Sequence, residues 1–166
     1  ASLPMSSHVH VEVRVPIATV RLDGPERHNA IDVEGWRAVA VAFETLSERD
    51  DVQCVAVRGT GGRAFSAGSD ISAFSAQRSS VQDVRKYSAA IAAALDAVRV
   101  CRHPTIAIIE GICVGGGLEI AACCDLRVCG ESSRFGAPIT RLGLTMSHDE
   151  LEPLLNLVGS GPVLEI

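Results

Sequence analysis

The sequence predicts an α/β fold in a single domain. With 166 residues, the chain is long enough to bury one substantial core. Apolar residues make up 47 % of it and aromatic residues only 4 %, so the core must consist mainly of Val, Ile, Leu and Ala. Short apolar runs alternate with longer segments of helical periodicity along the whole chain, an order typical of α/β proteins.

The first half of the chain shows both patterns. Residues 8–15 alternate between apolar and polar and predict a half-buried strand, and residues 17–23 predict a second strand paired with it. Asp32 precedes a run with apolar residues at helical spacing, so we expect it to cap a helix that ends near Arg49. Residues 52–59 predict a buried strand.

The second half continues the alternation. A helix is expected over residues 81–100, because His103-Pro104 disfavours its continuation. The apolar run 105–115 predicts one strand, and the glycines after it open another helix. The remaining expected elements are a short strand over 126–130, a strand and loop over 132–146, a helix over 149–158 and the start of a helix at Pro162.

Composition and charge exclude several classes of protein. The net charge of −5 provides no basic stripe for nucleic acid. No run is apolar enough for a membrane span or a signal peptide, so a cytoplasmic location is the default. The six cysteines form no Cys-x-x-Cys pair and the five histidines are scattered, so we expect reduced, buried cysteines and no metal site.

The stretch "VGGGLEIAACCD", residues 114–125, carries the main functional signal. Three glycines lead into a helix whose first turn holds the acid Glu119. The stretch is not a dinucleotide fingerprint, because the third glycine position holds Ile120. Neither a Gly-Lys-Ser/Thr loop nor a Gly-x-Ser-x-Gly elbow occurs in the chain.

A backbone donor site is the remaining interpretation. Glycines at a helix start leave N–H groups free to stabilise an oxyanion, and the loop 59–70 is a second glycine-lined stretch that can supply another donor. Glu119 can then move a proton on the carbon next to a polarised carbonyl. It can equally be no more than a helix-capping acid, and the residues alone leave both readings open.

These two glycine-lined stretches, with their flanking segments, resemble the crotonase (enoyl-CoA hydratase/isomerase) superfamily. The matching text is "RLDGPERHNAID", "VQCVAVRGTGGRAFSAGSDI" and "HPTIAIIEGICVGGGLEIAACCDLRVCGESSRFGAPITRLGL". The resemblance implies a crotonase-like spiral of repeated β-β-α units. It also implies a core domain over 17–166 after an N-terminal tail and first strand over 1–16, and an end before the family's C-terminal helical region, which builds trimers or hexamers.

The resemblance also assigns roles to residues. The backbone N–H groups of Ser69 and Gly116 correspond to the family's oxyanion hole, which holds the thioester oxygen of an acyl-CoA, and Glu119 corresponds to its first catalytic glutamate. CoA is then part of the substrate, and no separate cofactor or metal is implied. The substrate-binding positions carried over are Arg27, Ala30, Ala67, Gly68, Asp70, Ile71, Gly115 and Ile139.

The chain departs from the family at its second acid. Hydratases of the family carry a glutamate after the proline of "FG-x-P", and here Ile139 stands there. Asp149 or His148 can replace this acid, and we take Asp149 as the catalytic candidate. Residues 147–152 equally suit a solvated helix start capped by Ser147. Besides hydration or isomerisation, the alternatives are another enolate reaction, such as decarboxylation or C–C cleavage, and a non-catalytic acyl-CoA binder.

Overall fold

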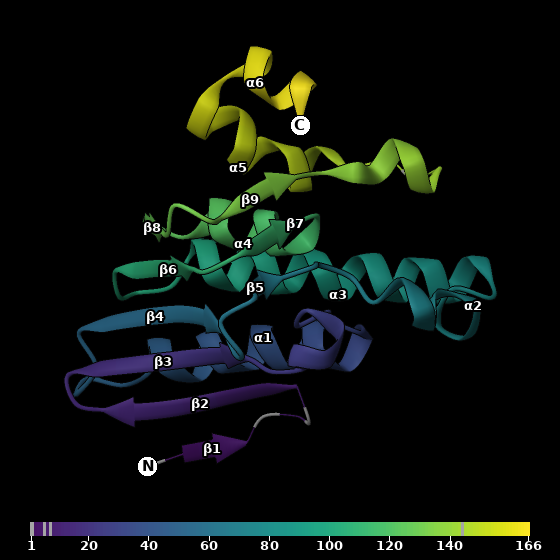
Figure 1. The fold of residues 1–166 in the computed structure, drawn as a ribbon. Coiled ribbons are helices and arrows are strands. Elements are labelled where there is room, and N and C mark those ends of the chain that lie inside the picture. The colour runs from purple at the N-terminus through teal and green to yellow at the C-terminus, as the bar shows by residue number, and fades with distance from the viewer. Residues whose placement is uncertain (1, 5, 7, 144) are drawn as a thin grey trace.

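The computed structural model describes residues 2–4, 6, 8–143 and 145–166. Figure 1 shows the elements following one another upward, from β1 to α6, with helices lying beside the strands. A six-stranded sheet has the order β1-β2-β3-β4-β6-β8, and a three-stranded sheet has the order β5-β7-β9. The strands are β1 Ser2–Pro4, β2 Val9–Arg14, β3 Ile17–Leu22, β4 Cys54–Gly59, β5 Ala64–Ser66, β6 Thr105–Ile109, β7 Ile112–Val114, β8 Leu126–Cys129 and β9 Arg134–Gly136.

Parallel pairing dominates both sheets, as the alternation of strands and helices predicts. The β1–β2 and β2–β3 pairs are antiparallel, whereas β3, β4, β6 and β8 run parallel, and so do β5, β7 and β9. The helices are α1 Val33–Ser47, α2 Phe74–Gln77, α3 Val81–Arg99, α4 Gly116–Cys123, α5 His148–Val158 and α6 Ser160–Glu165, with 3₁₀ turns η1 Pro25–Arg27, η2 Ile71–Ala73 and η3 Pro138–Leu142.

Helices α1 and α3 pack together and contribute several of the largest buried side chains. Asp32 caps α1, as the sequence predicts, and its carboxylate accepts from the N–H of Gly35 at 2.8 Å. The chain's few aromatic side chains are concentrated here, with Trp36, Phe43 and Tyr87 all buried. The core around them is built from Val, Ile, Leu and Ala, as the composition requires.

One expectation about local structure is wrong and another is confirmed. Residues 105–115 do not form one strand but two, β6 and β7, which belong to different sheets. The chain turns between them at Gly111, whose φ of +68° is a conformation that glycine adopts without strain. At the N-terminus, β2 and β3 form the predicted hairpin, and the sheet therefore continues across residue 16.

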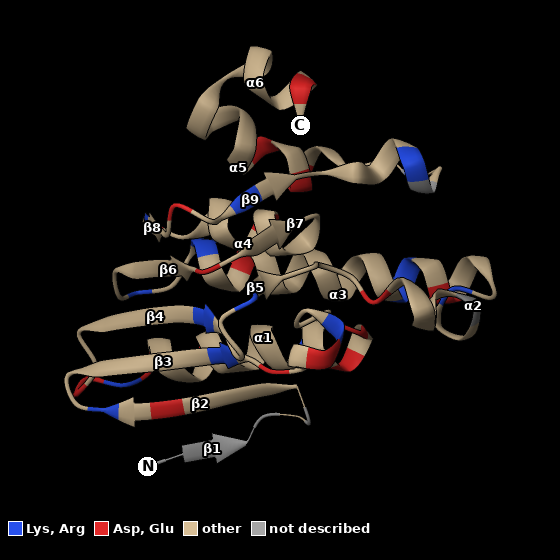
Figure 2. Cartoon of the chain, viewed as in Figure 1, with Lys and Arg blue, Asp and Glu red and all other residues tan. Residues whose placement is uncertain are grey.

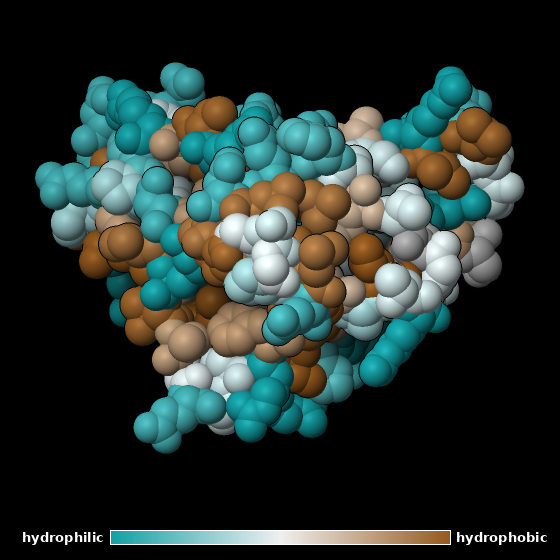
Figure 3. Space-filling view, turned by 90° about the horizontal axis from the view of Figure 1, so that it is seen from above, coloured by the Kyte–Doolittle hydropathy of each residue, from teal (hydrophilic) through white to brown (hydrophobic). Residues whose placement is uncertain are grey.

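The surface shows where charge and apolar area lie. Acidic and basic residues are intermingled along the chain in Figure 2, and Glu12 on β2 pairs with Arg14 and Arg21. Seen from above, apolar side chains gather in the middle of the molecule (Figure 3). Phe135, Leu157 and Leu164, from the uppermost elements, are among the exposed apolar residues.

Candidate active site

The two glycine-lined stretches meet at one point. Gly68, in the loop after β5, has a φ of +81°, and a Cβ there would lie 2.5 Å from the backbone nitrogen of Gly116. A Cβ on Gly116 would in turn lie 2.6 Å from the ring of Trp36. Only glycine fits at both positions, and the loop therefore packs directly against the start of α4.

This packing leaves two backbone donors side by side. The loop is held by Ile31, whose N–H donates to the carbonyl of Gly68 and whose carbonyl accepts from the N–H of Asp70, both at 2.8 Å. The N–H of Ser69, between these two bonds, has no acceptor among the described residues. Gly116 is the first residue of α4, so its N–H has no partner within the helix.

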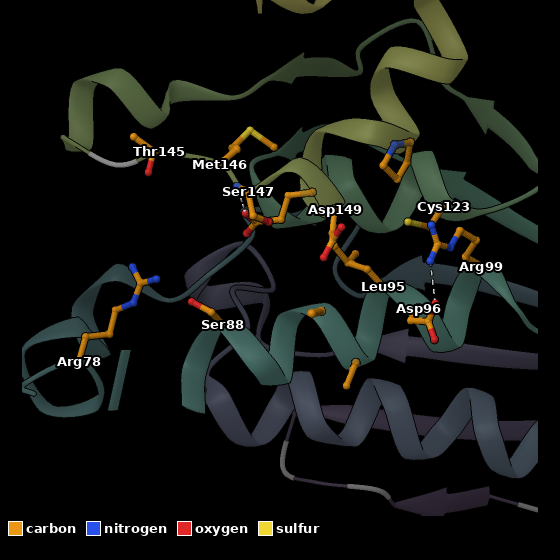
Figure 4. Close-up of a pocket in the computed structure, with 14 residues that line it drawn as sticks. Arg78, Ser88, Leu95, Asp96, Arg99, Cys123, Thr145, Met146, Ser147 and Asp149 are labelled. Carbon is orange, nitrogen blue, oxygen red and sulfur yellow. Dashed lines mark hydrogen bonds and ion pairs between the residues drawn. The ribbon is translucent and has the colours of Figure 1, made fainter. Parts of the chain in front are cut away.

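Three adjoining cavities lie in this region, and two of them reach the donors. The mouth groove, about 440 Å³, is lined by Arg27, Ala30, Ala67, Ser69, Asp70, Ile71, Ser72, Pro138 and Arg141. The central cavity, about 110 Å³, is lined by Ala67, Ser69, Ile71, Phe74, Arg78, Ile91, Gly115, Gly116, Glu119, Pro138, Ile139, Thr145, Met146 and Glu150. The α3–α5 cavity, about 580 Å³, shares Arg78, Thr145, Met146 and Glu150 with the central one (Figure 4).

Most residues predicted to bind substrate line the mouth groove or the central cavity. Five of them line the groove: Arg27, Ala30, Ala67, Asp70 and Ile71. Gly115 and Ile139 line the central cavity, and Gly68 lies behind it, packed on α4.

One ion pair shapes the wall of the mouth groove. The guanidinium of Arg27 pairs with the carboxylate of Asp70, and its other Nη lies 3.1 Å from Nε2 of His8. The same carboxylate accepts from the N–H of Ser72 at 3.0 Å. Asp70 thus both begins η2 and holds Arg27 beside the groove.

Glu119 is a buried acid in the wall of the central cavity. It lies in the first turn of α4 and is only 5 % exposed. Burial, and to a lesser degree the nearby charge of Glu150, raises its pKa from 4.5 to about 8. At neutral pH its side chain therefore carries a proton that it can donate.

A second acid in the central cavity is Glu150, which the sequence analysis did not select. One of its carboxylate oxygens accepts from the N–H of Ser147 at 2.5 Å, which holds the side chain at the start of α5. Asp149 lines the α3–α5 cavity but not the central one, and His148 is exposed and lines none of the three. The catalytic role of Asp149 therefore stays a prediction.

The signal for Glu150 was present in the helical spacing. Leu154, four residues later, is the buried residue of α5, and residues four apart share one helix face. Glu150 thus lies on the inward face of α5. Ile139, at the position of the expected glutamate, lies in the same cavity.

Three further observations concern metal ligands, thiols and membrane spans. The described part of the chain contains no group of three or more His, Cys, Asp or Glu side chains arranged to hold a metal ion. Burial raises the pKa of the Cys113, Cys123 and Cys124 thiols to about 12, so these thiols are poor nucleophiles. No described helix is both long and apolar enough to cross a membrane.

Comparison with known proteins gives one consistent family. Residues 12–166 match the family described as "Enoyl-CoA hydratase/isomerase". An Arabidopsis thaliana protein named "Probable enoyl-CoA hydratase 2, mitochondrial" is 35 % identical over 143 residues, which cover 86 % of this chain and 47 % of the relative. A Dictyostelium discoideum mitochondrial Delta(3,5)-Delta(2,4)-dienoyl-CoA isomerase is 26 % identical over 90 % of this chain and 54 % of its own length.

Solved structures agree. A crystal structure of an enoyl-CoA hydratase/carnithine racemase from Magnetospirillum magneticum superposes with a TM-score of 0.92 at 40 % identity. The match covers 97 % of this chain and 60 % of that one. The chain thus spans about half the length of the curated relatives it matches.

Proposed function

Because this chain belongs to the enoyl-CoA hydratase/isomerase family, we propose that it acts on acyl-CoA thioesters and adds water to a 2-enoyl group. One observation carries this proposal beyond the family. Two carboxyl groups, Glu119 and Glu150, line the same cavity as the free N–H groups of Ser69 and Gly116. Hydration needs an acid, a base and an oxyanion acceptor at one place, and this cavity contains candidates for all three.

The proposed reaction begins at the thioester. Its carbonyl oxygen accepts from the N–H groups of Ser69 and Gly116, which lowers the energy of the enolate. Glu150, as a carboxylate, takes a proton from a water molecule while the water oxygen bonds to the β-carbon. The double-bond electrons move toward the thioester and form the enolate. Glu119, which is protonated at neutral pH because of its raised pKa, gives its proton to the α-carbon.

The mouth groove supplies a path for the CoA part. It shares Ala67, Ser69 and Ile71 with the central cavity, so a ligand that enters the groove reaches the donors directly. Arg27, on its wall, offers positive charge to a phosphate. CoA is here part of the substrate, and the proposed steps require no other cofactor.

Isomerisation is the second candidate, because Ile139 stands where the family's hydratases carry their second acid. If Glu150 does not act on water, Glu119 alone can move a proton from one carbon to another through the same enolate. The cytoplasmic location and the trimer or hexamer stay predictions.

An NMR time course in D₂O separates these possibilities. The chain and its Glu119→Gln variant are each incubated with a trans-2-enoyl-CoA, and the surface variant Glu131→Gln is the matched control. Hydration gives a 3-hydroxyacyl-CoA with deuterium at the α-carbon, and the rate falls about 1,000-fold in Glu119→Gln and not in Glu131→Gln. Deuterium without a hydroxyl group indicates isomerisation. Binding without either product refutes catalysis and leaves an acyl-CoA binder.

A further inference from the structure

Arg78 lies where the central cavity and the α3–α5 cavity join. It follows the last residue of α2 and lines both cavities. Figure 4 shows its side chain extending from the α2 side toward Thr145, across the open space of the α3–α5 cavity. The reaction proposed above does not use this residue.

The guanidinium of Arg78 is held in place but has no anionic partner. Its carbon lies over two aromatic rings that contact each other edge to face, 4.5 Å from the ring centre of Phe74 and 4.8 Å from that of Tyr87. Its Nε is buried without a hydrogen-bond partner. No described residue accepts a hydrogen bond from it or forms an ion pair with it. Aromatic rings accept no conventional hydrogen bond, so the N–H groups of this guanidinium are left for an acceptor.

Most other charged groups of the α3–α5 cavity are already engaged, and Asp149, which also lines it, forms no ion pair with Arg78. Arg99 pairs with Asp96 at 2.8 Å and with Glu152 at 3.2 Å. Glu150 accepts from the backbone of Ser147 and makes no ion pair with Arg78, although both line the same two cavities. A buried donor without an acceptor is costly and calls for an explanation.

A bound acyl group would bring such an acceptor. With its thioester oxygen at Ser69 and Gly116, an acyl chain that passes Glu119 reaches the boundary with the α3–α5 cavity, where Arg78 lies. Polar and charged residues such as Ser88, Thr145 and Ser147 make up most of the lining there. This lining suits a polar acyl end better than a long hydrocarbon tail.

We propose that Arg78 binds a carboxylate at the distal end of the acyl group, so that the site selects short dicarboxylic acyl-CoA thioesters. A carboxylate matches the guanidinium edge with two parallel hydrogen bonds. This inference rests on the proposed acyl-CoA function, because it uses the position of the thioester. It adds to that function the class of acyl group.

Binding titrations test the proposal without requiring turnover. Calorimetry compares succinyl-CoA with butyryl-CoA, glutaryl-CoA with valeryl-CoA, and adipyl-CoA with hexanoyl-CoA, each pair having chains of equal carbon number. We expect at least one carboxylate ligand to bind roughly tenfold or more tightly than its partner. Arg78→Met abolishes that ratio, Arg78→Lys keeps part of it, and Arg99→Met, in the same cavity, leaves it unchanged.

Several results overturn the inference. Equal affinities within every pair do so, as does a preference that survives in Arg78→Met. If Arg78→Met weakens the binding of both ligands of a pair equally, Arg78 stabilises the fold or positions Glu150 and does not bind the acyl carboxylate. A thermal melt of this variant distinguishes these two roles. If Arg99→Met also abolishes the affinity ratio, the preference comes from the overall positive charge of the cavity and not from Arg78. If CoA and all six thioesters fail to bind, the proposed function itself fails, whereas binding of CoA alone with no acyl preference refutes only the role of Arg78.

Discussion

The two walls of the central cavity are built in different ways. One wall, the donor wall, consists of loop residues 67–70 and the start of α4, and it packs into the core at Trp36. The other, the acid wall, consists of η3 and the start of α5, where Leu154 is the buried residue of the helix and Thr145 and Ser147 are exposed. Close packing and two hydrogen bonds to Ile31 fix the first wall, whereas the start of α5 is held by its cap and by the buried side chain of Leu154.

This difference means that the backbone donors are fixed in place, whereas the position of the carboxylate can vary. The donor wall offers backbone N–H groups, whose position depends on close packing and not on which side chain is present. The acid wall offers a carboxylate from whichever residue faces the cavity, here Glu150 and not position 139. A fold of this kind can keep one pair of backbone donors while its acid changes position, and the reaction can change with it.

The largest expected effect is on the pH dependence of stability, and it comes from Glu119, the acid on the donor wall. The pKa of Glu119 is about 8 in the folded chain and near 4.5 when unfolded. Between these values the folded state holds a proton that the unfolded state has lost, so the free energy of unfolding falls as pH rises from 5 to 8. At about 1.4 kcal/mol per pKa unit, the loss is on the order of a few kcal/mol.

Urea unfolding at pH 5 and pH 8 measures this effect. Glu119→Gln removes the proton difference, so its free energy of unfolding relative to the unmodified chain rises by roughly 2–4 kcal/mol between the two pH values. Glu131→Gln, on the surface, keeps the unmodified slope. If Glu119→Gln and the unmodified chain show the same pH dependence, Glu119 does not hold its proton in the fold, and the acid step proposed for it is wrong.

The acid wall gives the next largest effect, in activity rather than stability. Glu150→Gln removes the proposed base and lowers kcat for hydration about 100-fold, with little change in acyl-CoA affinity. Asp149→Asn, one residue away, changes kcat less than about threefold, because Asp149 does not line the central cavity. Steady-state kinetics of both variants decide between the two residues. The reverse pattern would restore Asp149 as the catalytic acid and remove Glu150.

The same contrast explains what the sequence could predict. Local patterns encode most of the strands and the Asp32 cap, because those features depend on periodicity and on capping chemistry. The assignment of Ser69 and Gly116 as donors came from the resemblance to the crotonase superfamily, and the contact of Gly68 with Gly116 came from the structure. The division of residues 105–115 into β6 and β7 escaped prediction, since both halves are apolar and only the turn at Gly111 separates them. The choice of Glu150 over Asp149 depends on how α5 is rotated against the rest of the fold, a tertiary property that one buried leucine decides.

The donor wall gives the smallest expected effect, which tests whether close packing defines it. Gly68 and Gly62 both have positive φ values, +81° and +68°, but a Cβ on Gly62 would meet nothing within 4 Å, whereas a Cβ on Gly68 would press on the nitrogen of Gly116. Gly62→Ala therefore lowers the free energy of unfolding only through backbone strain, by about 1 kcal/mol. Gly68→Ala adds crowding to the strain and lowers the free energy of unfolding by about 1–3 kcal/mol more.

Urea unfolding of the two variants gives this difference, and acyl-CoA titration gives its consequence for the site. Because the methyl group of Gly68→Ala would sit against the N–H of Gly116, we expect this variant to bind acyl-CoA more weakly and Gly62→Ala to bind it normally. Equal stabilities would mean that the loop can move away from α4 at no cost. The donor wall would then be as adaptable as the acid wall, and the contrast between them would disappear.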